Sequence, residues 1–227
     1  MATSDIQIAE HALQHHFADM EQQRETASFG MWAFLLTEVM FFGGMFCAYL
    51  VYRAAYYQAF VQGSQRMDLL AGAVNTAVLI CSSLTMALAV RAAKMGKSKT
   101  VVTFLLITIL FAFAFLVIKG FEYHGHWVDH QFPGPNFHFE PLKGPAVDPL
   151  HTEIFFSLYW VMTGLHALHV IVGIMLITWL VTVILRGRVS AHYYNPVDTV
   201  GLYWHFVDLV WIYLFPLFYL ISKQHGS

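Results

Sequence analysis

VVTFLLITILFAFAFLVI, residues 101–118, decides the fold of this chain, because it carries no charge and only two threonines among apolar side chains. A helix of about 18 residues is about 27 Å long, close to the hydrocarbon thickness of a bilayer, about 30 Å. Lipid offers backbone amides no hydrogen-bond partner, so a segment of this kind must be helical. The stretch therefore predicts a transmembrane helix.

Further apolar stretches lie on either side and predict transmembrane helices over residues 29–52, 69–90, 154–185 and 200–221. The run 154–185 would be about 48 Å long as a helix, so we expect it to tilt or to protrude. The runs are continuous rather than alternating, which disfavours a β-barrel. The prediction is an all-α integral membrane protein, with one bundle of five transmembrane helices over residues 29–222. A polar segment 1–28 precedes it and a short tail 223–227 follows.

The composition agrees with lipid as the solvent and excludes other classes. Hydrophobic residues make up 58% of the chain and charged residues 11%, against about 25% charged in soluble domains. The net charge of −2 provides no field for nucleic acid. Cys47 and Cys81 lie in apolar runs and form no CxxC pattern, which favours two core residues over a disulfide, covalent haem or an iron–sulfur cluster.

The distribution of basic residues predicts the orientation. The connection after residue 90 contains four of them in nine positions: Arg91, Lys94, Lys97 and Lys99. By the positive-inside rule this connection is cytoplasmic, which places the N-terminus inside and the C-terminus outside. The proline-rich connection 122–153 would then be an external loop. Segment 1–28 is acidic and has no apolar centre, so we expect no cleavable signal peptide.

Glu38 lies well inside the first predicted helix, where a charged carboxylate costs about 2.5–3.5 kcal/mol unless it is protonated, paired or hydrated. It must therefore face protein or a polar cavity. A proton-linked or lipid-contacting carboxyl and a structural interhelical hydrogen bond are equally compatible with the sequence.

Polar residues also recur at helical spacing in the last two predicted helices. His166 and His169 share one helical face, and so do His205 and Asp208. Imidazoles at this spacing can bind a metal or haem, but the Glu-x-x-His pairs of a di-iron bundle are missing. We interpret the four residues as an interhelical polar network, in which Asp208 and Glu38 are candidate partners of the imidazoles.

Other polar residues receive structural interpretations. Lys119 and Glu122 are one turn apart, which predicts an ion pair near the membrane interface. Asn75 suits close helix packing and completes the predicted structural polar network together with Glu122. The connection after residue 185 carries candidates for anionic lipid headgroups, Arg186, Arg188 and His192. Two arginines at this place are equally typical of a general positive-inside anchor.

Five segments together resemble subunit III of the haem-copper terminal oxidases. In chain order these segments are LLTEVMFFGGMFCAYL, NTAVLICSS, FEYHGHW, GLHALHVIVG and YWHFVDLVWIYLF. The resemblance covers residues 25–222, and it is closest to the short bacterial form, whose helices correspond to helices III–VII of the seven-helix subunit. It implies a non-catalytic subunit in a bacterial cytoplasmic (inner) membrane, within a complex that reduces oxygen and pumps protons.

The resemblance also implies partners and residue roles. Subunits I and II are the expected partners, with a small subunit IV as a further candidate, and haem and copper belong to those partners rather than to this chain. We expect no catalytic or metal-binding residue here, but we expect bound phospholipid and a role in proton uptake and turnover stability. Glu38 matches the intramembrane carboxyl of the family, and His166, His169, His205 and Asp208 match its histidine and WHFVD motifs.

Several alternatives stay open. Quinol-oxidase members of similar length often carry aspartate at the position of Glu38, so the glutamate favours cytochrome c as the electron donor. The accessory subunit of nitric oxide reductase is a related alternative. Outside the family, a membrane metalloenzyme using the histidines, or a proton channel using Glu38, would be the competing functions.

Overall fold

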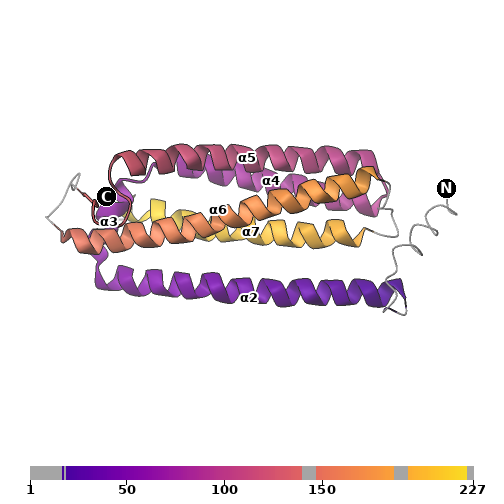
Figure 1. Ribbon diagram of the computed structural model, residues 1–227, viewed down its shortest axis with the longest axis horizontal. Helices are drawn as coiled ribbons and strands as arrows, with labels where there is room; N and C mark the ends of the chain where they lie inside the picture. The colour runs from indigo at the N-terminus through magenta and orange to yellow at the C-terminus, as the bar shows by residue number, and fades with distance from the viewer. Residues whose placement is uncertain (1–16, 18, 140–146, 187–193, 224–227) are drawn as a thin grey trace. The chain divides into compact units, whose positions relative to one another are not determined.

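The computed structural model describes residue 17 and residues 19–139, 147–186 and 194–223, and most of these residues are helical, with no strand among them. The elements are α2 Met20–Ala55, α3 Tyr57–Gln65, α4 Leu69–Lys94, α5 Ser98–Val128, α6 Pro149–Leu185, α7 Asn195–Tyr219 and the 3₁₀ turn η1 Ile221–Lys223 (Figure 1). Five of them, α2 and α4 to α7, are long and apolar enough to cross a membrane, which confirms the predicted helical transmembrane fold.

The helices extend beyond the predicted apolar runs. Helix α2 begins at Met20, inside the segment 1–28, and α5 continues to Val128, so that Glu122 lies on a helix and not in the loop expected over 122–153. Helix α6 begins at Pro149, and the short helix α3 was not predicted. The physical reason is that hydropathy marks only the part of a helix that lipid surrounds, whereas backbone hydrogen bonding continues through polar turns.

Local chemistry explains where several helices begin and end. The side chains of Asp19, Asp68 and Asp148 accept hydrogen bonds from the first backbone amides of α2, α4 and α6 at 2.7 to 3.1 Å, as N-terminal caps do. Between α4 and α5, Gly96 has φ 70°, a left-handed conformation that glycine adopts without strain. The amide of Lys97 then returns to the carbonyl of Ala92 at 3.0 Å and closes the helix end.

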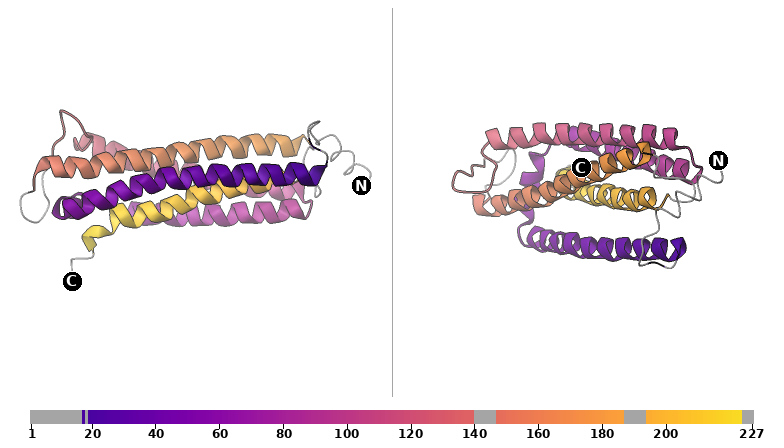
Figure 2. Two further views of the ribbon diagram at one scale, coloured as in Figure 1. Left: turned by 90° about the horizontal axis from the view of Figure 1, so that it is seen from below. Right: turned by 45° about the vertical axis from the view of Figure 1, so that its right-hand side comes forward.

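The chain divides into two compact units, and each long helix contributes one part to each. Unit 1 contains the described residues of Met1–Glu38, Leu79–Phe113 and His169–Asp208. Its core is formed by fully buried side chains of α4 to α7, among them Met86, Leu105, Ile177 and Trp204. The last part of α4 and the first part of α5 both belong to this unit, and they are joined by a hydrogen bond of 2.8 Å between the hydroxyls of Thr85 and Thr108 (Figure 2).

Unit 2 contains the described residues of Val39–Val78, Ala114–Leu168 and Leu209–Ser227. Its core is aromatic: the ring of Tyr49 lies 5.3 Å from Phe60 and 5.1 Å from Phe218, and Phe155 lies 5.4 Å from Phe60 and 5.7 Å from Phe218. These rings come from α2, α3, α6 and α7. Edge-to-face packing of this kind stabilises the unit beyond the burial of area alone.

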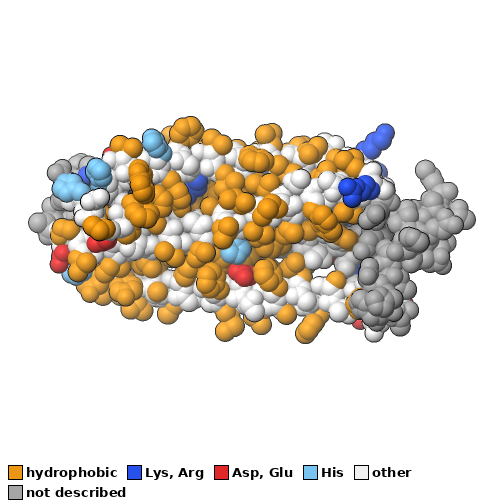
Figure 3. Space-filling model, in the orientation of Figure 1, with side chains coloured by type: hydrophobic (Ala, Val, Ile, Leu, Met, Phe, Trp, Pro, Cys, Tyr) orange, Lys and Arg blue, Asp and Glu red, His pale blue; other side chains and the backbone are white. Residues whose placement is uncertain are grey.

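The outer surface is that of a membrane protein. Hydrophobic side chains dominate the face shown in Figure 3. Many large apolar residues are exposed, including Phe29, Met40, Leu110, Phe121 and Met175. Such exposure is unfavourable in water and expected in lipid or against another membrane subunit.

Candidate functional site

Glu38 of α2 pairs with His169 of α6 inside unit 1. The imidazole Nε2 lies 3.1 Å from Oε2 of the carboxylate, and the side chains of His169 and Glu38 are 16% and 18% exposed, respectively. The backbone carbonyl of His169 also accepts a hydrogen bond from the hydroxyl of Tyr203 at 3.0 Å, which ties α7 to the same place. The membrane carboxyl is thus paired with one of the predicted histidines, and both side chains are partly exposed.

His205 and Asp208 lie on α7 in the same unit. Ser83 Oγ is 2.7 Å from His205 Nδ1, and the indole N–H of Trp204 donates to Ser82 Oγ at 2.9 Å. The carboxyl of Asp208 is buried, and neither of its oxygens has a hydrogen-bond partner among the described residues. Serines of α4, which the sequence did not single out, are therefore the partners of this face of α7.

Helices α6 and α7 pack closely against each other in unit 1, at Gly173 and Trp204. A Cβ added to Gly173 would lie 2.5 Å from the ring of Trp204, closer than real atoms approach. Glycine at this position therefore allows the indole to approach the α6 backbone closely.

Lys119 forms the centre of a buried polar cluster in unit 2. The cluster contains the ion pair with Glu122 that the sequence predicted. Its ammonium group donates to Glu122 Oε2 at 3.2 Å, Tyr159 Oη at 3.0 Å and Tyr219 Oη at 2.8 Å. The hydroxyls of Tyr159 and Tyr219 in turn donate to the other carboxylate oxygen, Glu122 Oε1. The cluster links α5, α6 and α7 and leaves both charges paired.

Aromatic rings surround the same ammonium group. The rings of Tyr123, Tyr159, Trp211 and Tyr219 have their centroids 4.7 to 5.5 Å from Nζ of Lys119. Cation–π attraction is strengthened where water is excluded, and Lys119 is only 2% exposed. Tyr159 and Tyr219 are parts of this cluster that the sequence analysis missed, because they lie 40 and 100 residues from Lys119 in the chain and no helical spacing relates them to it.

The cluster continues towards the α5–α6 connection. His126 Nδ1 lies 2.6 Å from Gln131 Oε1, and the carbonyl of Gln131 accepts the indole N–H of Trp160 at 3.3 Å. His126 Nε2 faces Glu122 at 4.0 Å, too far for a hydrogen bond. The first residues of the connection are thereby attached to α5 and α6.

Asn75 and His166 belong to unit 2 and are fully buried. The ring of His166 lies 5.4 Å from Phe115 and 5.2 Å from Trp211. The amide oxygen and nitrogen of Asn75 have no hydrogen-bond partner among the described residues. The predicted polar residues are therefore distributed over separate groups, two of which lie in unit 1 around Glu38 and His205.

A basic cluster lies where α2, α4 and α7 meet in unit 1. The ring of Tyr194 lies 5.5 Å from both the guanidinium of Arg24 and the ammonium of Lys94, and Lys94 also pairs with Asp198 at 3.6 Å. Arg186 is exposed after the last turn of α6. The other two predicted headgroup ligands, Arg188 and His192, lie outside the described residues.

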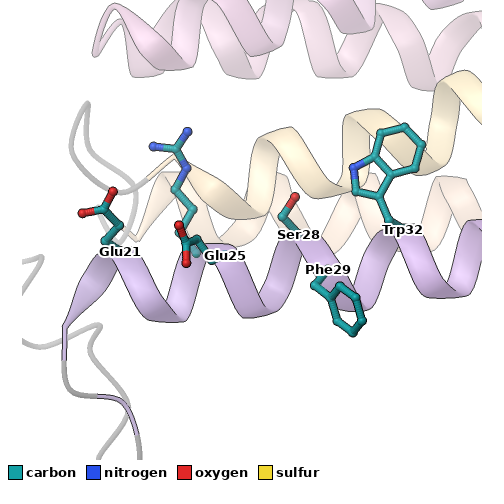
Figure 4. A pocket seen from close by; sticks show the side chains of 6 residues that line it. Glu21, Glu25, Ser28, Phe29 and Trp32 are labelled. Atoms are coloured by element: carbon teal, nitrogen blue, oxygen red, sulfur yellow. The ribbon is translucent and has the colours of Figure 1, made fainter.

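A hollow of about 610 Å³ lies beside the first half of α2 and is lined by Glu21, Arg24, Glu25, Ser28, Phe29 and Trp32 (Figure 4). Charged side chains line its beginning and aromatic ones its end. A hollow that is charged at one end and apolar at the other suits an amphiphile.

Among the residues that the structure describes, no three histidine, cysteine or acidic side chains are placed to hold a metal ion.

Comparison with known proteins assigns these features to a family. Residues 4–129 and 148–223 match the family model for cytochrome c oxidase subunit III. Cytochrome c oxidase subunit 3 from Synechocystis sp. is 34% identical over 197 residues, covering 85% of this chain and 75% of the relative. Quinol oxidase subunit 3 from Bacillus subtilis is 29% identical over 210 residues, covering 90% and 93%, respectively. Heme-copper oxidase subunit I+III from Aeropyrum pernix is 30% identical over 197 residues, covering 84% of this chain and 22% of that protein.

Proposed function

Because this chain belongs to the cytochrome c oxidase subunit III family, we propose that it is the non-catalytic third subunit of a respiratory oxidase. In this proposal it packs against subunits I and II of a complex in a bacterial cytoplasmic membrane, with its N-terminus inside. The redox centres, haem and copper, belong to the partner subunits. The relative named subunit I+III supports the contact with subunit I, because it joins a homologous region to that subunit in one polypeptide.

The observation that carries the proposal is the Glu38–His169 pair on the least buried transmembrane helix. In the most apolar window of α2 only 17% of residues are buried, against 50% in α7. The Glu38–His169 pair is thus accessible from lipid or from a partner subunit. This supports a role for Glu38 in sustaining proton uptake by the complex and in prolonging its turnover.

Phospholipid binding is the second part of the proposal. The hollow beside α2 has Arg24 at its charged end and Trp32 at its aromatic end. A cationic group at the membrane interface attracts an anionic headgroup, and tryptophan favours the same level of the bilayer. Arg186 is exposed and could contribute a second positive charge to headgroup binding.

The assignment is tested by purification through a tag on this chain, followed by identification of the subunits and a reduced-minus-oxidised spectrum. Haem and copper that arrive with larger subunits, and that are lost when this chain is separated, support the proposal. Haem or metal that stays on the isolated chain contradicts it and restores the metalloenzyme hypothesis.

The electron donor needs its own assay, because both cytochrome c and quinol oxidases occur among the relatives. We propose cytochrome c, and the purified complex should then oxidise reduced cytochrome c and not a quinol. Quinol oxidation by the complex would favour the alternative, a quinol oxidase subunit III.

The role of Glu38 is tested with Glu38→Ala in the assembled complex. We expect unchanged haem spectra, fewer turnovers before inactivation and less bound phospholipid, measured by oxygen consumption and mass spectrometry. Thr37→Ala is the matched control, since this neighbouring side chain is exposed and bonds only within its own helix at Phe34. Loss of haem from fully assembled Glu38→Ala complex would refute the accessory role.

A further inference from the structure

Asp208 of α7 carries a buried carboxyl group that has no hydrogen-bond partner among the described residues. The residue is 3% exposed, and neither carboxyl oxygen has a hydrogen-bond partner among the described residues. Buried polar groups in proteins are almost always hydrogen-bonded, to protein or to ordered water. Inside a membrane-spanning helix the cost of leaving such a group unpaired is higher still.

The surrounding side chains of unit 1 cannot supply the missing bonds alone. The hydroxyl of Ser83 is a candidate donor to the carboxyl, but this hydroxyl already lies 2.7 Å from His205 Nδ1. A serine has one O–H to donate, whereas a carboxyl group has about four acceptor positions. Ser82, one residue earlier, is engaged by the indole of Trp204 at 2.9 Å. Acceptor positions on Asp208 therefore remain open whichever tautomer His205 adopts.

We propose that an ordered water molecule lies between α4 and α7 in unit 1 and bonds to Asp208 and Ser83. Water donates and accepts, and it is stably buried where two to four polar partners surround it. A divalent cation fits less well, because it requires several oxygen ligands and the described residues place no three candidate metal ligands together. The water gives α7 a polar link to α4 in addition to the Ser83–His205 bond.

The test is an electron cryomicroscopy map of the intact complex at a resolution that shows internal water. We expect a density peak about 2.6–3.2 Å from an Asp208 carboxyl oxygen and from Ser83 Oγ. The peak should persist in Asp208→Asn, whose amide still bonds to water, and disappear in Asp208→Leu. Ser82→Ala is the matched control and should keep the peak, because Ser82 bonds to Trp204 instead.

The native map alone can overturn the proposal, even if a variant fails to assemble. Absence of the peak, in a map where other internal waters are resolved, would show that no water occupies the site. A direct bond from a protein donor to each carboxyl oxygen would give the same answer. A peak with three or more oxygen contacts shorter than about 2.5 Å would identify a cation and would also refute the water.

Discussion

Replacing Lys119 by methionine should be among the most damaging single changes in this chain. Methionine fills a similar volume but removes the ammonium group, which makes three hydrogen bonds to Glu122, Tyr159 and Tyr219 at 2.8–3.2 Å. Glu122 would stay buried without its cationic partner, with hydrogen bonds from the two tyrosines to one oxygen only. Breaking a buried ion pair by removing one partner costs about 3–5 kcal/mol.

The expected magnitude can be expressed as a melting temperature. For a chain of this size about 1 kcal/mol corresponds to about 2–4 °C, so Lys119→Met should lower the unfolding midpoint by about 6–20 °C. The assay is thermal unfolding of the purified complex, followed by the release of this subunit. Lys99→Met, on the same helix but with an exposed side chain, is the control and should have almost no effect.

A double substitution tests the reasoning itself. In Lys119→Met combined with Glu122→Gln no charge remains, and the amide oxygen still accepts from both tyrosines. We expect the double variant to recover more than half of the lost stability. If Lys119→Met melts within about 2 °C of the native complex, or if the double variant is less stable than the single one, the charges are not what holds the cluster together.

Two further predictions concern packing and hydrogen bonds. Gly173→Ala should lower the unfolding midpoint, because its Cβ would lie 2.5 Å from Trp204. The control Gly43→Ala, whose Cβ would have nothing within 4 Å, should be neutral or stabilising by up to about 1 kcal/mol. Equal effects of the two variants in thermal unfolding would contradict the close approach of Gly173 and Trp204. Trp211→Phe should lose the 3.1 Å bond to Thr76, worth about 1 kcal/mol, together with part of the ring packing against Lys119 and His166. Adding Thr76→Val should then cost little more in the same assay. A full additional loss in that double variant would show that the bond contributes nothing.

The helices themselves follow from the sequence. The run 101–118 has no charge, the length of a bilayer core and no alternating pattern, and a helix satisfies all of its amides within the segment itself. The ion pair of Lys119 with Glu122 was predictable too, because residues three apart on a helix face each other wherever the helix is placed. Helix ends were less predictable. Helix α5, for example, continues beyond the apolar run, through the more polar segment 122–128, and ends at Val128.

The partners of the polar side chains are decided by tertiary structure. Glu38 and His169 are 131 residues apart in the chain, and Ser83 and His205 are 122 apart, so no helical period relates them. In lipid every helix face is apolar, and the pattern that reveals the buried face of a soluble helix is missing. The sequence alone therefore determines that these groups must find partners within protein, since lipid offers none. Which groups meet depends on how α2, α4, α6 and α7 rotate and pack, and close contacts such as Gly173 against Trp204 fix that packing only in the folded chain.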